Sequence, residues 1–135
     1  MTSRSETGKL GEDIACDFLK NNGSTVLFRN VLNKFGEIDI VARDHGGTLV
    51  FVEVKTIRQS SWQAIRQCGN SKTFAEFMPE DQMGSSKMRK FKRIAGFFAN
   101  EHQELFDEDA SWRLDFVGVI FDDSGAHAVR HYKNI

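Results

Sequence analysis

The chain has 135 residues, 40% of them hydrophobic, which is enough for one hydrophobic core but short for two domains of ordinary size. Its formal net charge of −1 excludes the overall basic character common in nucleic-acid-binding proteins, so any contact with DNA requires a local basic patch. Because it has no membrane-length apolar run, no hydrophobic signal core and only two distant cysteines, we expect a single cytoplasmic domain over residues 1–135.

Residues 5–22 are predicted to form the first helix, because apolar residues recur there with helical spacing, at Leu10, Ile14, Ala15, Phe18 and Leu19. Gly23 follows and is a suitable C-cap, since glycine adopts the left-handed conformation without strain. The next run, residues 24–29, is short and rich in strand-forming residues, and residues 30–35 are interpreted as a connection.

Two longer strands are predicted over residues 36–43 and 48–56. The four residues between them, Asp44-His45-Gly46-Gly47, end in two glycines that suit a tight hairpin turn. The following stretch, residues 57–84, is polar and without periodicity, which indicates a long loop.

The last third of the chain predicts a second helix and a second hairpin. The helix begins at Ser85 or Ser86, either of which can cap it, and runs to about Glu104 with a buried face of Met88, Phe91, Ala95 and Phe98. The hairpin pairs residues 112–123 with residues 126–133. The predicted order is therefore helix, three strands, helix, two strands.

The hydrophobic pattern selects one register for the central hairpin. A turn centred on Gly46 gathers the apolar residues of both strands on one face: Ile38, Ile40, Ala42, Val50, Val52 and Val54. The same register opposes Asp39 to Glu53 and Glu37 to Lys55, whereas a shift of one residue would mix charges into the apolar face.

Two opposed carboxylates repel each other, by about 0.2–1 kcal/mol when solvated and by more when buried. A divalent cation would offset the repulsion, since Mg²⁺ is typically held by one or two carboxylates together with waters and substrate phosphates. Lys55 follows Glu53 on the same face, where an ammonium can position a water or stabilise charge on a phosphate. The alternative is a solvated strand face with a surface ion pair between Glu37 and Lys55. Leu49 and Phe51 on the Glu53 face favour the functional interpretation, because they indicate that this face is partly covered.

These residues carry a resemblance to a known family. Gly36-Glu37-Ile38-Asp39 followed by Phe51-Val52-Glu53-Val54-Lys55 resembles the core motif of the YraN-type family of small bacterial proteins, which is similar to archaeal Holliday-junction resolvases within the PD-(D/E)xK nuclease superfamily. The resemblance extends to further positions: Gly8, Gly11, Glu12, Ala15, Arg29-Asn30 and Arg113-Leu114-Asp115. It implies an α/β fold with a restriction-endonuclease-like αβββαβ core, in which a mixed central sheet is flanked by helices.

The resemblance also implies an activity and a set of site residues. The activity is cleavage of phosphodiester bonds in DNA, including branched or structured DNA, with Mg²⁺ or Mn²⁺ as cofactor. Asp39, Glu53 and Glu12 would be the metal ligands, and Lys55 would be the catalytic lysine. From the sequence alone, Glu12 is equally well explained as a glutamate in the first turns of a helix, where it is favourable to the helix dipole.

Five cations gather at the start of the second predicted helix: Lys87, Arg89, Lys90, Lys92 and Arg93. This cluster is the credible phosphate-contacting patch of the chain, with Lys87 as the first candidate, although a charge run is often only a solvated helix face. The family commonly has an arginine two residues after its lysine, but here Ile57 stands at that position and Arg58 follows it. Arg58 is retained as a candidate DNA contact.

Two pairs of residues in the last two strands are not assigned to the site. Arg113 and Asp115 share a strand face and are expected to form an ion pair. His127 and His131 have no acidic partner that strand spacing identifies. Two functions remain open: a metal-dependent endonuclease acting on DNA, with a homodimer as one arrangement, and a non-catalytic nucleic-acid-binding or adaptor protein that retains the nuclease fold.

Overall fold

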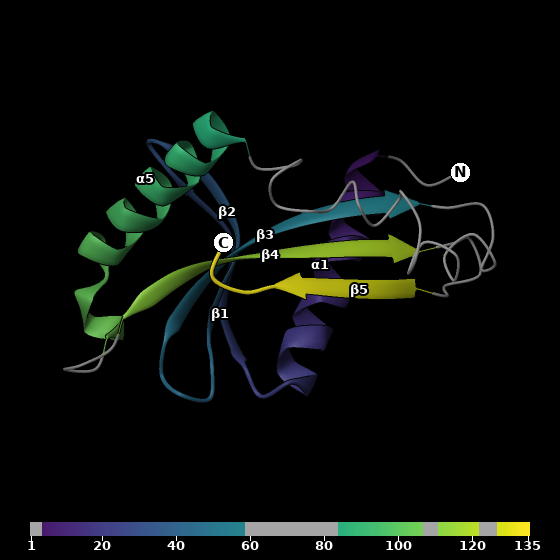
Figure 1. The fold of residues 1–135 in the computed structure, drawn as a ribbon, viewed down its shortest axis with the longest axis horizontal. Coiled ribbons are helices and arrows are strands. Elements are labelled where there is room, and N and C mark those ends of the chain that lie inside the picture. The colour runs from purple at the N-terminus through teal and green to yellow at the C-terminus, as the bar shows by residue number, and fades with distance from the viewer. Residues whose placement is uncertain (1–3, 59–83, 107–110, 122–126) are drawn as a thin grey trace.

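The computed structural model describes residues 4–58, 84–106, 111–121 and 127–135. Its elements follow the predicted order (Figure 1): α1 (Arg4–Asn21), β1 (Thr25–Asn33), β2 (Gly36–Arg43), β3 (Leu49–Arg58), α5 (Ser85–Glu101), a short 3-10 helix η1 (Gln103–Leu105), β4 (Trp112–Phe121) and β5 (His127–Tyr132). The predicted αβββαβ core is confirmed. Most of the predicted loop over residues 57–84, and the turn of the second hairpin, lie outside the described residues.

The five strands form one sheet in chain order, β1-β2-β3-β4-β5. Three neighbouring pairs are antiparallel, and β3 with β4 is parallel, because α5 lies between them in the chain and carries it back to the starting end of β3. The predicted mixed sheet flanked by helices is thus confirmed.

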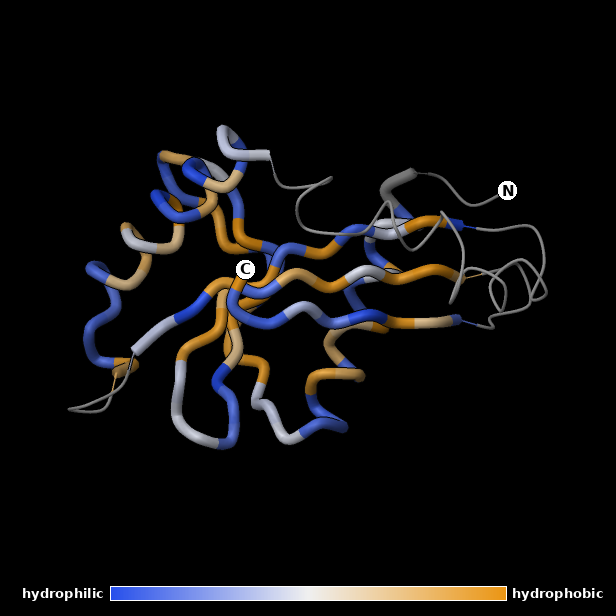
Figure 2. The backbone as a smooth tube through the Cα atoms, in the orientation of Figure 1, coloured by the Kyte–Doolittle hydropathy of each residue, from blue (hydrophilic) through white to orange (hydrophobic). Residues whose placement is uncertain are grey.

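The two helices serve two separate hydrophobic cores, which lie on opposite faces of the sheet. Alternate residues of β3 face alternate cores: Leu49 and Phe51 pack with α5, whereas Val50 and Val52 pack with α1. Figure 2 shows the hydrophobic residues concentrated along these inner strands. Because both faces of β3 are covered, polar residues on it stand out as candidates for function.

Helix α1 packs on β3 through small residues. Gly11 and Ala15 are buried, and a Cβ at Gly11 would collide with the side chain of Thr56 on β3. The buried stripe therefore runs through Gly11, Ala15 and Leu19, and the prediction that Leu10 belongs to it is wrong, since Leu10 is 41% exposed. The predicted C-cap is confirmed, because Gly23 has φ +92° and Ser24 N–H donates to the Leu19 carbonyl oxygen.

Two other boundaries differ from the prediction. Strand β1 continues to Asn33, so residues 30–33 belong to a strand and not to a connection. Helix α5 begins after Gly84, which makes no side-chain capping bond, so Ser85 and Ser86 lie inside the helix and neither caps it. Among the described residues, no helix combines the length and the apolar character that crossing a membrane would require.

Candidate active site

The candidate site lies where β2 and β3 stop pairing. The predicted register is confirmed over Ile40–Arg43, where Ile40 opposes Val52 and Ala42 opposes Val50. Beyond Ile40 the main-chain pairing ends. There the Val54 N–H donates to Asp39 Oδ2 at 2.8 Å, so the aspartate side chain takes the place of the missing main-chain acceptor. The carboxylate is thereby fixed at the point where the two strands part.

Part of the predicted apolar face of the hairpin is wrong, because β2 becomes irregular where its pairing with β3 ends. Ile38 was expected beside Ile40, but Ile38 belongs to the α5 core and Ile40 to the α1 core. The neighbouring strand is irregular at the same level, because Asn30 on β1 has φ +52°. Since the strand changes face at Asp39, neither the expected opposition of Asp39 to Glu53 nor that of Glu37 to Lys55 is part of the β2–β3 ladder.

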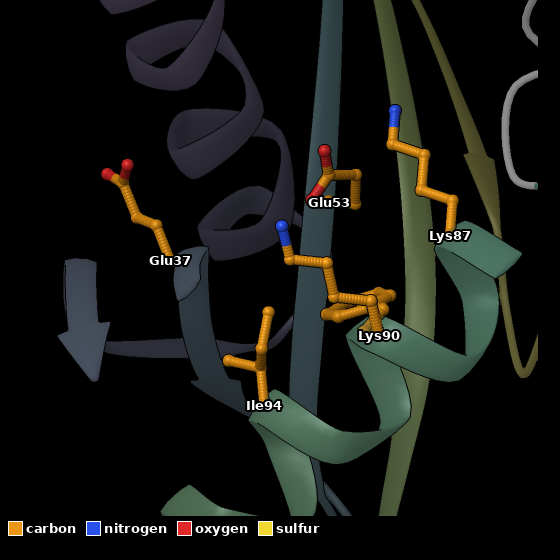
Figure 3. A pocket seen from close by; sticks show the side chains of 6 residues that line it. Glu37, Glu53, Lys87, Lys90 and Ile94 are labelled. Carbon is orange, nitrogen blue, oxygen red and sulfur yellow. The ribbon is translucent and has the colours of Figure 1, made fainter. Parts of the chain in front are cut away.

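Glu53 lies on the face of β3 that is covered by α5, one alternation beyond Phe51. It lines a cavity of about 180 Å³ together with Glu37, Lys87, Lys90, Phe91 and Ile94. Figure 3 shows the ammonium groups of Lys87 and Lys90 projecting from α5 toward Glu53. A carboxylate on the sheet thus faces cations on the helix across a space of about 180 Å³.

Glu12 approaches this region from α1. Its side chain is half-buried, and within the described part of the chain its Oε1 atom is buried without a hydrogen-bond partner. The Arg29 Nη2 atom lies 3.9 Å from that oxygen, whereas Arg29 Nη1 pairs closely with Asp13 at 2.7 Å. A buried, partnerless carboxylate oxygen is costly, which marks Glu12 as a group with an unused ligand position.

The carboxylates perturb one another. Burial first, and then repulsion from Asp39, raises the pKa of Glu53 to about 7, and the nearby Lys87 opposes this rise. The pKa of Glu12 is raised for the same two reasons, in the same order. Burial also raises the pKa of Asp39, although the hydrogen bond from Val54 works against it. These are the conditions that a bound cation would relieve.

The paired carboxylates of Asp39 and Glu53 can be compared with the ligands that a divalent cation requires. Within residues 4–58, 84–106, 111–121 and 127–135, no three His, Cys, Asp or Glu side chains form a group that could hold a metal ion. Mg²⁺, however, commonly uses one or two carboxylates and completes its shell with water. Asp39 and Glu53 supply oxygen ligands of that kind, whereas the structure does not bring Glu12 into one ligand group with them. The residues therefore fit Mg²⁺ or Mn²⁺ in chemistry and charge.

Lys55 and Arg58 occupy different positions relative to these carboxylates. The β3–β4 ladder is continuous from Leu49 to Arg58, so Lys55 shares the face of Glu53, as predicted, and its side chain is exposed. Arg58 lies on the other face and five residues along the strand, roughly 17 Å away at about 3.3 Å per residue. The structure does not bring Arg58 to the carboxylates, and its role in DNA contact stays a prediction.

The basic surface around α5 includes one cation that was not chosen from the sequence, Lys34. Arg89 and Lys90 line a second cavity of about 350 Å³ with Ser86 and Arg93. Arg93 and Lys34 also lie over aromatic rings near the β1–β2 turn, at 5.3 and 5.2 Å from the Phe35 ring centre. Sequence reasoning missed Lys34, and it missed Glu37 as a lining residue. The Gly-Glu-Ile-Asp motif was the available signal for Glu37.

At the other end of the sheet, the expected ion pair is confirmed: Arg113 Nε lies 3.0 Å from Asp115 Oδ1. The interpretation of His131 is corrected, because its Nε2 atom lies 2.7 Å from Asp115 Oδ2. The two residues lie on neighbouring antiparallel strands, with Val117 opposite His131, so the diagonal contact across the strands was not visible from spacing along one strand.

A model of the uncharacterised protein family UPF0102 matches residues 11–119. A UPF0102 protein of Dictyoglomus turgidum is 37% identical over 120 residues, which cover 89% of this chain and 86% of that protein. A UPF0102 protein of Streptomyces griseus is 33% identical over 135 residues, covering 100% and 99% of the two chains.

Two solved structures show a distant likeness. One is titled as a complex of EndoMS with double-stranded DNA, and it matches with a TM-score of 0.36 at 18% identity, over 86% of this chain and 38% of that one. The other is a repair endonuclease from Pyrococcus abyssi, with a TM-score of 0.29 at 14% identity, over 84% and 47% of the two chains. The chain thus spans less than half the length of either of these two proteins.

Proposed function

Because the chain belongs to the uncharacterised protein family UPF0102, whose name assigns no activity, we propose its function from its own residues: metal-dependent hydrolysis of phosphodiester bonds in DNA. The observation that carries this proposal is the half-buried Glu53 carboxylate, whose pKa is raised to about 7 beside Asp39. It shares a cavity with Lys87 and Lys90, so acidic ligands for a cation and basic ligands for a phosphate meet in one place.

Asp39 and Glu53, with Glu12 as the third carboxylate, would hold Mg²⁺ or Mn²⁺. The bound cation would supply Lewis acidity toward the phosphate and would lower the pKa of a coordinated water. Asp39 is suited to this role because the Val54 N–H fixes one of its oxygens at 2.8 Å. Glu12 is suited because its buried Oε1 makes no hydrogen bond within the described residues and has only the Arg29 guanidinium at 3.9 Å as an ion-pair partner.

The lysines would act on the substrate. Lys55 lies on the Glu53 face with an exposed side chain, from which its ammonium can hold the attacking water or stabilise charge that develops on the phosphate. Lys87 and Lys90 project toward Glu53 and would bind non-bridging oxygens of the DNA strand (Figure 3). Lys55 is thus assigned to the attacking water or the scissile phosphate, and Lys87 and Lys90 are assigned to the backbone of the DNA strand.

The substrate that this surface fits best is DNA that can enter between α5 and the parting strands. Arg89, Arg93 and Lys90 line the second cavity on α5, which shares Lys90 with the Glu53 cavity, so a strand leaving the site past Lys90 would meet further cations. We propose branched or structured DNA as the substrate class, since such DNA exposes a strand where a duplex is interrupted. The alternative is a non-catalytic protein that binds DNA with the same basic surface.

A cleavage panel tests the proposal. Linear, flapped, forked and four-way DNA would be incubated with the protein, with and without Mn²⁺, and with Glu53→Gln as the inactive control. We expect Mn²⁺-dependent cleavage of at least one branched substrate by the wild type alone. Binding without cleavage of every substrate, under all metal conditions, would refute hydrolysis and favour the non-catalytic alternative.

A further inference from the structure

A third cavity, of about 440 Å³, lies at the end of the sheet where β2 turns into β3. It is lined by the end of α1, the β2–β3 turn and the ends of β4 and β5: Phe18, Leu19, Asn22, Ser24, Asp44, His45, Arg113, His131 and Lys133. Asp44 directly follows the end of β2 and lies five residues from Asp39, which places this cavity roughly 17 Å from the carboxylate site. It is therefore separate from the proposed active site.

The carboxylates at this cavity are already occupied by partners within the protein. Asp115 is completely buried and accepts bonds from Arg113, from His131 Nε2 at 2.7 Å and from the Asn134 N–H at 3.0 Å. Asp44 Oδ2 accepts from Arg113 Nη1 at 2.6 Å, and its Oδ1 accepts from two main-chain N–H groups of the turn. Neither acid is positioned to serve a bound cation.

The groups with remaining capacity at this cavity are mainly donors. A guanidinium has five N–H groups, and the bonds from Arg113 to Asp44 and Asp115 use three of them. Lys133 is exposed, and the His45 ring also lines the cavity, whereas His131 donates through Nε2 to Asp115, so that its Nδ1 atom is an acceptor in the neutral imidazole. The positive charges of Arg113 and Lys133 balance the negative charges of Asp44 and Asp115. The preference of the cavity for an oxyanion therefore comes from its surplus of N–H donors and not from net charge.

We propose that this cavity binds an oxyanion, namely the phosphate group of a phosphorylated ligand. The carboxylates of Asp44 and Asp115 hold the Arg113 guanidinium in place. Binding of a planar or tetrahedral oxyanion by its remaining N–H groups therefore costs little side-chain entropy. Lys133 and His45 also line the cavity, and Phe18 and Leu19 offer apolar surface to the body of the ligand. The buried Asp115 acts as a positioning residue for Arg113 and His131.

Such a phosphate can come from two sources, a free phosphorylated small molecule or the backbone of a DNA molecule that extends from the carboxylate site. The first measurement is an NMR titration of the full chain with inorganic phosphate, which monitors the imidazole nitrogens. We expect saturable shifts for His45 and His131 and none for His102, which lies beyond the end of α5. Lys133→Ala should weaken phosphate binding about tenfold, and Lys20→Ala, an exposed lysine outside the cavity, should not.

The second measurement distinguishes the sources and does not depend on cleavage. If DNA supplies the phosphate, long duplexes should shift the His45 signal, and Lys133→Ala should lower the log–log salt slope of DNA binding by about 0.9. If a small molecule supplies it, a nucleoside monophosphate should produce the shift while DNA affinity is unchanged. The proposal is overturned if neither phosphate, nucleotide nor DNA gives saturable shifts, or if Lys133→Ala and Lys20→Ala behave alike.

Discussion

In metal-free buffer, the free energy of unfolding should fall as the pH rises from about 5 to 8, and Glu53→Gln should remove most of that fall. Folding raises the pKa of Glu53 from 4.5 to about 7, first because burial disfavours its charge and second because Asp39 lies nearby. Between these values the folded protein holds a proton that the unfolded chain has released. The stabilisation is therefore fully present below the unfolded pKa and is lost as the pH rises through the folded pKa.

The magnitude follows from the same values. A rise from 4.5 to about 7, at 1.36 kcal/mol per pH unit, corresponds to roughly 3 kcal/mol. Because Glu53 lines an open cavity, solvent screens part of the penalty, and we expect about 2 kcal/mol.

Urea unfolding of the wild type and of Glu53→Gln at pH 5, 6, 7 and 8 in EDTA measures this effect. Glu101→Gln, which changes an exposed glutamate at the end of α5, is the matched control and should follow the wild type. Parallel pH profiles for the wild type and Glu53→Gln would refute the argument that folding buries an unfavourable charge at this site.

Three further predictions concern the metal, the DNA and the fold. Asp39→Ala should abolish or strongly weaken Mg²⁺ or Mn²⁺ binding in calorimetric titrations, and wild-type affinity in the variant would remove Asp39 from the ligand set. Lys87→Ala and Lys90→Ala should each weaken DNA binding and lower its log–log salt slope by about 0.9 while leaving metal affinity intact, and an unchanged slope would mark them as solvated surface. Gly11→Ala should destabilise the protein by about 1–3 kcal/mol in chemical unfolding, because its methyl group would collide with β3. Gly8→Ala meets nothing within 4 Å and should be neutral or stabilising, so equal effects of the two changes would contradict the packing argument.

The central hairpin was predictable because two independent signals agree on it. The glycine-containing turn limits where the chain can reverse, and the alternation of Ile40 and Ala42 against Val50 and Val52 allows one register. The same alternation places Glu53 and Lys55 on one face of a strand that is covered on both sides. The turn and the alternation thus account for the register over Ile40–Arg43, whereas the predicted opposition of Asp39 to Glu53 lies beyond the end of the β2–β3 ladder.

Departures from regular geometry could not be predicted from a repeating pattern. Period-two alternation assumes a continuous strand, but β2 changes face between Ile38 and Ile40, and Asn30 on the neighbouring strand adopts a positive φ. Helical periodicity likewise placed Leu10 in the core, although the close approach at Gly11 turns that side chain outward.

Contacts between distant segments were also outside the reach of the sequence pattern. Lys90 and Glu37 line one cavity because the chain crosses from β3 through α5 to β4, and no local period relates these two residues. The contact of His131 with Asp115 depends similarly on the diagonal geometry of β4 and β5. The first of these contacts places Lys90, from the basic run of α5, beside the carboxylates of Glu37 and Glu53.

The most direct test of the proposed function compares single-turnover cleavage by the wild type and by Lys55→Ala. A branched DNA substrate is incubated with a saturating excess of protein in the presence of Mn²⁺. The account predicts that the wild type cleaves and that Lys55→Ala binds the substrate equally well but cleaves it about 10²–10³ times more slowly, as expected for a group that stabilises developing charge. Equal cleavage rates would show that Lys55 is not catalytic. Binding without any cleavage by the wild type would contradict the assignment of a nuclease.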